Sequence, residues 1–468
     1  MGLFSSESRL KAAEFREFVY EARWALWFAF VVYAANIASA DLRGDSIMYA
    51  MISKNILTLD SPLIMHYNGS VYMNKPPLLF WLNALPMKLF GYSVFSAKLI
   101  PLITAVLLSG FVYHITRKLY EDANIAHLAV FIMNSTYVVY KNTYSLRLES
   151  MVTLFMVVAL WSFMHYQEDR AKGWLYTAGI ACGLGFMVKG FVGVLPMAAV
   201  FIYALIFDRK IFSKEEMKKI LPALLLFLLT FIWWYTYVSL KTDFFTHFFK
   251  NQILDRMMNG LFQNGDTGIN YAQRPIYNYI LYLLEHHIIY LPFLIYGMYR
   301  TVKMRTADKS RQAIFLLTAL IVTFVAIHFI STRQSRYMYQ FYVIAAVFTA
   351  GGLGAVLRIN YRKFLVFFSV LYASVLIISP VDMNWRTYSE LEELAQMSSM
   401  AGIPIVAEVD KFKDHEDKSG VAYFLDEYST VKPETGRYFL IMDKKSGRSA
   451  DMLQLMETRR LRIGIAGE

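Results

Sequence analysis

Residues 45–91 read DSIMYAMISKNILTLDSPLIMHYNGSVYMNKPPLLFWLNALPMKLFG, and this stretch determines how the rest of the chain is interpreted. It begins with a carboxylate, Asp45, and is divided near its middle by the pair Pro76–Pro77. Apolar residues recur at helical spacing in residues 46–59, and residues 78–89 are aromatic and apolar. We therefore expect two short helices that lie along a membrane interface, separated by the two prolines.

The composition of the whole chain is typical of a membrane protein. Of its 468 residues, 56% are hydrophobic, 16% are aromatic and only 18% are charged. A soluble domain of this length would carry more charge. A spanning helix needs roughly 20 apolar residues, and on that measure we predict about eleven spans. They lie near residues 24–40, 97–116, 124–141, 150–166, 174–188, 191–207, 220–239, 281–299, 312–330, 338–357 and 364–380.

The short loops between these predicted spans indicate how the protein is oriented. Lys and Arg are enriched in loops that stay in the cytoplasm. With eleven spans, five basic loops fall on one side, at residues 117–118, 170–172, 208–219, 300–311 and 358–363. We therefore predict an integral protein of a bacterial inner membrane. Its long loop of residues 41–95 would face the external, periplasmic side.

The tail of residues 381–468 differs in character from the rest. Residues 385–400 have helical periodicity, and β-rich stretches alternate with polar links at Ile403–Val409, Val421–Leu425 and Tyr438–Met442. The predicted fold class is therefore an all-α polytopic membrane protein, residues 1–380, with interfacial helices in external loops. A small soluble α/β domain would follow it on the external side.

Two isolated carboxylates are predicted on the external side at the same depth. Asp45 follows the first span, and Glu149 closes a tight external turn at the start of the fourth span. Taken singly, Asp45 could be a solvated loop residue or a helix cap, and Glu149 an acid favoured by the helix dipole. Together they are candidates for deprotonating an acceptor or for holding a divalent cation near a phosphate.

Basic residues on the external side run against the orientation rule. A single one could extend its head group toward lipid phosphates. A whole set lying among tyrosines better fits a phosphate ligand, because Arg and Lys are the usual phosphate binders. At the lipid boundary, that phosphate would belong to a lipid. The candidates are Lys75, Arg147, Lys189, Arg256, Arg274 and Arg336, with Tyr72 and Tyr337.

The sequence Glu285-His286-His287 is a weaker candidate metal motif. Adjacent residues on a helix point in different directions, so both imidazoles cannot easily face one ion. We keep His286 or His287 as one candidate ligand and otherwise interpret the motif as an interfacial cluster.

The motifs of the first loop resemble a known family. They are Asp45-Ser-Ile-Met-Tyr49, then Tyr72-Met-Asn-Lys75-Pro-Pro-Leu-Leu-Phe-Trp81, then Leu89-Phe-Gly-Tyr-Ser-Val-Phe95. They resemble the first external loop of the polyprenyl-phosphate-sugar glycosyltransferases of the C-type fold. This group includes the aminoarabinose transferase of lipid A and the protein O-mannosyltransferases. Further matches are Arg147-Leu-Glu149, the Gly-rich run from Gly183 to Gly190, and Phe248-Phe249 followed by Arg256.

Position by position, the resemblance implies roles for individual residues. Asp45 would be the catalytic carboxylate and Glu149 the second acid. Lys75 and Arg256 would hold the donor phosphate, with help from Tyr72 and Tyr337. The chain differs from the aminoarabinose transferases at two potential metal-ligand positions. Asn74 stands where aminoarabinose transferases have an acid before Lys-Pro-Pro, and Gln252-Ile253 stands where they have an acidic-His pair.

The predicted function is therefore sugar transfer from an undecaprenyl-type phosphate carrier to an external acceptor, with inversion of the anomeric centre. The acceptor could be lipid A, another glycolipid, a glycan or a protein. The sequence has no nucleotide-binding motif, and we expect no nucleotide cofactor and no nucleic-acid partner. One alternative is a transporter or flippase of an anionic lipid, although such proteins usually carry internal repeats and midplane charges. A non-catalytic protein that binds lipid-linked sugars is a third possibility.

Overall fold

The structure is a computed structural model of the 468-residue chain. The residues that it describes are 6–39, 42, 44–254, 275, 277–303, 307–330, 333–357, 360–378, 390–408, 421–423, 425, 429–430, 433, 437–443, 452–457 and 461–466.

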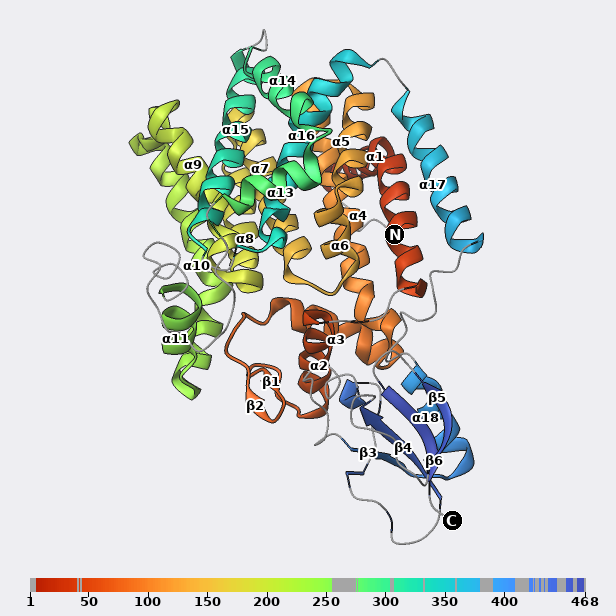
Figure 1. Ribbon diagram of the computed structural model, residues 1–468. Helices are drawn as coiled ribbons and strands as arrows, with labels where there is room; N and C mark the ends of the chain where they lie inside the picture. Colours follow the sequence, from red (N-terminus) through yellow and green to blue (C-terminus); the bar gives the residue numbers. More distant parts are fainter. Residues whose placement is uncertain are drawn as a thin grey trace.

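A bundle of long helices makes up most of this structure (Figure 1). Its helices are α1 (Ser6–Ser39), α4 (Val94–Tyr120), α5 (Ala123–Ser135), α6 (Tyr137–Tyr144), α7 (Leu148–Asp169), α8 (Lys172–Lys189), α9 (Leu195–Ile206), α10 (Lys214–Lys241), α13 (Asn278–His287), α14 (Leu291–Val302), α15 (Ala307–His328), α16 (Tyr339–Val356) and α17 (Tyr361–Ile378). Short helical turns connect several of them, namely η1 (Gly190–Val194), η2 (Arg209–Phe212), α11 (Phe244–Thr246), the π-helix η3 (His247–Leu254) and η4 (Ser335–Met338).

Six helical segments in the described ranges are long and apolar enough to cross a membrane. The number becomes seven if α13 and α14, which meet at a bend of 98°, count as one span. Outward-facing side chains fit contact with lipid. Leu221, Leu225 and Leu229 recur at four-residue spacing on α10 and are 62%, 56% and 55% exposed.

The predicted number of eleven spans is larger. One reason is that the sequence pattern counts two spans, near residues 174–188 and 191–207, within a single helical run. One helical run of 35 residues, 172–206, scores as a single span by length and composition. The run is folded back on itself, since a Cβ added at Gly193 would lie 2.2 Å from the carbonyl carbon of Gly185. In a straight helix, residues eight apart are about 12 Å apart. The eleven spans therefore stay a prediction.

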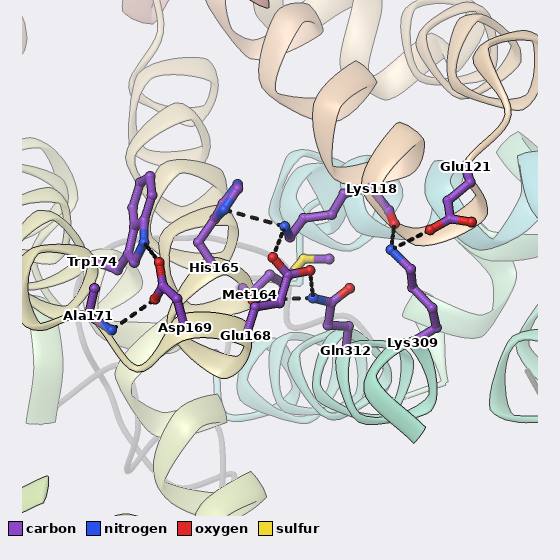
Figure 2. A network of polar contacts seen from close by, with 10 residues as sticks. All are labelled: Lys118, Glu121, Met164, His165, Glu168, Asp169, Ala171, Trp174, Lys309 and Gln312. Carbon is purple, nitrogen blue, oxygen red and sulfur yellow. Dashed lines mark hydrogen bonds and ion pairs between the residues drawn. The ribbon is translucent and has the colours of Figure 1, made fainter. Parts of the chain in front are cut away.

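A polar network ties three helices together at one end of the bundle (Figure 2). Lys118 on α4 pairs with Glu168 on α7, and Gln312 on α15 donates to the other carboxylate oxygen of Glu168 at 2.8 Å. Lys309 on α15 pairs with Glu121, just beyond α4, at 3.1 Å. Glu168 and Glu149 lie at opposite ends of α7, about 28 Å apart along the helix axis. The network therefore marks the end of the bundle opposite to both predicted acids.

Small residues allow α8 and α10 to pack closely. A Cβ added at Gly179 on α8 would lie 2.4 Å from the carbonyl oxygen of Ala223 on α10. At Gly183, one turn later, it would lie 2.8 Å from the carbonyl oxygen of Phe227. This small-xxx-small stripe is a common helix–helix contact in membranes. It holds in place the helix that ends at Lys189.

Gly179→Ala is therefore expected to destabilise the protein by about 1–3 kcal/mol, because the new methyl group must push the two helix backbones apart. Thermal unfolding in detergent measures the change. Gly173→Ala on the same helix is the matched control, since a Cβ there has nothing within 4 Å. Equal melting temperatures for the two variants would contradict the close contact.

The two short helices predicted in the first loop are present as α2 (Asp45–Thr58) and α3 (Leu78–Phe90). Their location along a membrane interface stays a prediction. A small hairpin, β1 (His66–Tyr67) and β2 (Ser70–Val71), lies between them in the chain. Both helices lie between the bundle and a sheet formed by the chain's last strands (Figure 1). The first loop is thus sandwiched between two parts of the protein.

The C-terminal sheet has four strands in the order β3-β4-β6-β5, and α18 (Glu390–Ala401) precedes it. The strands are β3 (Ile405–Ala407), β4 (Tyr438–Asp443), β5 (Met452–Glu457) and β6 (Leu461–Ala466), with β3 parallel to β4 and the other pairs antiparallel. The expected strand at Val421–Leu425 is wrong. Residues 421–423 form a helical turn, closed by a bond from the Leu425 N–H to the Val421 carbonyl at 2.9 Å.

The buried side chain of Lys54 connects the first loop to this C-terminal part. Its ammonium donates to the carbonyl oxygens of Ala422 and Tyr423 at 2.8 and 2.9 Å. The Tyr423 hydroxyl donates to the carbonyl of Ser93, just before α4, at 3.0 Å. One apolar core continues from α2 and α3 into the sheet. The loop that carries Asp45 is therefore fixed on two sides.

Candidate active site

Two helix N-termini bring the predicted carboxylates together. Asp45 is the first residue of α2, and Glu149 is the second residue of α7. Both positions suit an acid, because the positive end of a helix dipole stabilises negative charge. Arg147 precedes α7 in an extended conformation, and its guanidinium lies 3.3 Å from the Asp45 carboxylate.

Arg336 is the residue that joins the two acids. It lies in η4, just before α16, and its guanidinium forms an ion pair with Asp45. Its Nε atom is also 4.0 Å from a carboxylate oxygen of Glu149. Arg suits this bridging place, since its planar fork presents several donors in different directions. The structure therefore brings Asp45 and Glu149 together around Arg336.

Lys189 completes the cluster from the end of α8. Its ammonium donates to Glu149 at 2.8 Å, and both side chains are largely buried, 12% and 5% exposed. The chain turns sharply directly afterwards, at Gly190, where φ is +59° and ψ is −132°. Side chains other than glycine rarely adopt this conformation. The Lys-Gly pair in the sequence thus places a cation at the second acid.

The charge balance of this cluster bears on what it can bind. Arg147, Lys189 and Arg336 contribute three positive charges against the two carboxylates, so the described cluster has one positive charge in excess. A group of partly buried cations in excess over acids attracts an anion. A phosphate ester fits, because Arg forks and Lys ammonium groups both bind phosphate.

Three tyrosines line the same region. The Tyr337 ring lies 5.4 Å from the Lys189 ammonium and 5.7 Å from the Arg336 guanidinium, within reach of cation–π attraction. Tyr49, one turn after Asp45 on α2, interacts electrostatically with Tyr72, Asp45 and Glu149. Burial and these neighbours raise the pKa of Tyr49 well above its usual value. Its phenol therefore stays neutral and can donate a hydrogen bond.

Lys75 and Tyr72 lie in the segment between β2 and α3. Tyr72 packs edge-on against Phe80, which also contacts Tyr49, so the structure links Tyr72 to the helix that begins at Asp45. Lys75 is half-buried three residues later, directly before the two buried prolines. A contact between Lys75 and a donor phosphate stays a prediction.

The remaining candidates do not join this cluster. Arg256 and Arg274 lie outside the described residues. His286 lies 3.7 Å from Glu285, and the imidazole of buried His287 is 3.4 Å from the Thr349 hydroxyl. In the part of the chain that the structure describes, no three His, Cys, Asp or Glu side chains come together as a metal-ligand set. Metal binding therefore stays a prediction.

The sequence gives little indication of two features of the site, the place of Tyr49 and the bridging role of Arg336. Tyr49 could have been found from its position, since it lies four residues after Asp45 on a predicted helix and therefore on the same face. The bridging role of Arg336 has no local signal, because its partners are 291 and 187 positions away in the chain.

Comparison with known proteins gives this arrangement a context. Residues 74–235 match the family described as dolichyl-phosphate-mannose-protein mannosyltransferase. The chain is 25% identical over 302 residues to undecaprenyl phosphate-alpha-4-amino-4-deoxy-L-arabinose arabinosyl transferase 2 of Proteus mirabilis (strain HI4320), covering 64% of this chain and 52% of that protein. It is 30% identical over 246 residues to the corresponding arabinosyl transferase 1 of the same organism, covering 50% of this chain and 44% of that protein. The chain thus spans about half the length of these relatives.

The solved structure of ArnT from Cupriavidus metallidurans bound to undecaprenyl phosphate has the same fold. The TM-score is 0.67 over 96% of this chain and 97% of that one, at 14% sequence identity. The predicted resemblance is confirmed. In sequence over part of its length, and in fold over nearly all of it, the chain is similar to polyprenyl-phosphate glycosyltransferases of the arabinosyl transferase and mannosyltransferase type.

Proposed function

We propose that this protein is a membrane glycosyltransferase that moves a sugar from a polyprenyl phosphate carrier to an acceptor. The observation that carries the proposal is the joining of Asp45 and Glu149 by Arg336, with Arg147 and Lys189 alongside. This cluster supplies a carboxylate that can accept a proton and cations that can stabilise a phosphate leaving group. The names of the relatives, which are undecaprenyl phosphate arabinosyl transferases, support the same donor class.

The proposed reaction is a single displacement at the anomeric carbon. The lone pair of the acceptor oxygen or nitrogen forms the new bond to the anomeric carbon. As this bond forms, Asp45 takes the proton from the acceptor hydroxyl or amine. The bond between the anomeric carbon and the phosphate oxygen breaks, and its electron pair leaves with the lipid phosphate. Because attack and departure occur on opposite faces, the anomeric configuration inverts.

The cations act on the leaving group. Negative charge grows on the phosphate oxygen as the sugar departs, and fixed positive groups in a partly buried site stabilise that charge. Arg336 and Lys189 belong to the described cluster. Lys75 and Arg256 are proposed to bind the same phosphate on the basis of the family resemblance. Asp45 is 32% exposed at its side chain, consistent with access for an acceptor.

We further propose that the site lies at the external, periplasmic face of an inner membrane. The basic network at the far end of α7 supports this orientation, since Lys118 and Lys309 follow the rule for cytoplasmic ends. The division into a membrane module of residues 1–380 and an external domain of residues 381–468 belongs to the same proposal. So does the total of eleven spans.

A divalent cation is not needed for these steps. Both carboxylates already face guanidinium or ammonium groups, so an ion at the same atoms would have to displace them. The proposed steps therefore use side chains alone. A metal requirement would appear as loss of transfer after treatment with a chelator. The donor is already activated by its phosphate, so no nucleotide cofactor is required.

The test uses the purified full-length protein and polyprenyl phosphates that carry a radiolabelled sugar. Incubation with envelope glycolipids, glycans or proteins is expected to transfer label from the lipid to an acceptor and to release the polyprenyl phosphate. Label that crosses a vesicle membrane while still attached to the lipid would identify a flippase instead. Label that binds without leaving the lipid would also overturn the proposed transfer.

A further inference from the structure

The segment that carries Lys75 rests on an aromatic surface formed by α10 and α11. The Trp234 indole donates to the carbonyl of Leu63 at 2.9 Å, and Trp81 stacks on Trp233 at 5.9 Å between ring centroids. Met73 packs against the same cluster, which includes Phe244 and Phe248.

A polar contact links this segment to η3. The imidazole of His247, the first residue of η3, lies 3.1 Å from the side-chain carbonyl oxygen of Asn74, and its N–H can donate to that oxygen. The two residues are 173 positions apart in the chain. Asn74 directly precedes Lys75, so this bond holds the backbone from which the Lys75 side chain starts.

The next residue, Phe248, contacts the other lysine of the site. A Cβ added at Gly190 would lie 3.0 Å from the tip of the Phe248 ring, so the ring packs directly against the turn that follows Lys189. Phe248 is buried, at 7% exposed. A π-helix such as η3 is rare and is found frequently at functional sites. Adjacent residues of one short segment therefore contact the side chain of Asn74, next to Lys75, and the backbone of Gly190, next to Lys189.

We propose that His247 is a positioning residue that, through Asn74, sets Lys75 for binding the donor phosphate, while Phe248 sets Lys189. The proposal rests on the proposed glycosyl transfer and identifies what aligns the two lysines. His247 acts through Asn74 and touches no reacting atom. Its loss should therefore weaken donor binding while leaving the chemical step nearly unchanged.

The expected change is moderate, because one neutral hydrogen bond is lost. His247→Ala and Asn74→Ala should each raise the KM for the polyprenyl phosphate sugar roughly 5- to 10-fold, with kcat changed less than about 2-fold. Because both substitutions remove the same bond, the double variant should be no worse than either single variant. His247→Gln restores a side-chain donor and should recover most of the affinity. His114→Ala, on α4, serves as a matched control and should leave both parameters unchanged.

A second readout does not depend on transfer. Hydrogen–deuterium exchange of residues 66–77 in the full-length protein should speed up in His247→Ala and Asn74→Ala, and stay at the wild-type rate in His114→Ala. If the wild-type protein transfers no sugar, the proposed function fails and the exchange result still decides whether the contact fixes the segment. Additive effects of the two Ala substitutions, a fall in kcat at constant KM, or unchanged exchange would overturn the positioning role.

Discussion

Asp45→Asn is expected to lower sugar transfer by roughly 10²- to 10⁴-fold, the usual contribution of a general base. Asn has the same shape and can still accept a hydrogen bond from Arg336 or Arg147, but it cannot take the acceptor's proton. The fold should persist, because Asp45 is 32% exposed and lies at the start of a helix rather than in the core. Affinity for the lipid donor should change little.

Transfer assays with the radiolabelled donor measure this loss, and size-exclusion chromatography in detergent reports the folded fraction. Asp60→Asn is the matched control, since Asp60 is an exposed acid in the same loop, between α2 and β1. Its backbone φ of +47° suits Asn as well as Asp. Near-wild-type transfer by Asp45→Asn would remove this carboxylate from the mechanism.

The Glu149–Lys189 ion pair is expected to show the largest effect on stability. Lys189→Met leaves the nearly buried Glu149 carboxylate without its nearest cation, 2.8 Å away. Removing one partner of a buried pair costs about 3–5 kcal/mol, largely because a charge remains without compensation. The double variant Glu149→Gln with Lys189→Met should recover much of that loss, since no unpaired charge remains.

Chemical denaturation in detergent of the wild type, the two single variants and the double variant measures the coupling. The Asp308–Arg311 pair provides the comparison, because both side chains are exposed, at 72% and 56%. Its cycle should give about 0–1 kcal/mol. A coupling at Glu149–Lys189 no larger than that of the exposed pair would show that the site is open to solvent.

The sequence predicts the components of the site better than their connections. Asp45 and Glu149 each carry a local signal, namely an isolated acid beside an apolar span. Orientation counting then predicts both on one side of the membrane, and the structure brings both to Arg336. The ion pairs of Arg336 could not be predicted, because they join residues far apart in the chain and leave no periodic pattern.

Two further differences have physical reasons. Residues 172–206 count as one span by length and composition, whereas the sequence pattern predicts two, near residues 174–188 and 191–207, and the run folds back on itself between them. In the tail, Val421–Leu425 is as β-rich as a strand, but tertiary contacts override that preference. Val421 and Tyr423 are fully buried in the shared core, and Tyr423 also contacts Ser93.

In the proposed mechanism, the acids and cations of α2, α7, α8 and η4 surround a prenyl phosphate. A cryo-electron microscopy structure of the full-length protein in lipid nanodiscs, with a polyprenyl phosphate bound, would locate the phosphate relative to these side chains. We expect phosphate density within hydrogen-bond distance of Arg336, Lys189 or Lys75, with Asp45 facing the space where the sugar would lie. Phosphate bound instead at the opposite end of the bundle, beside Lys118 and Lys309, would contradict it.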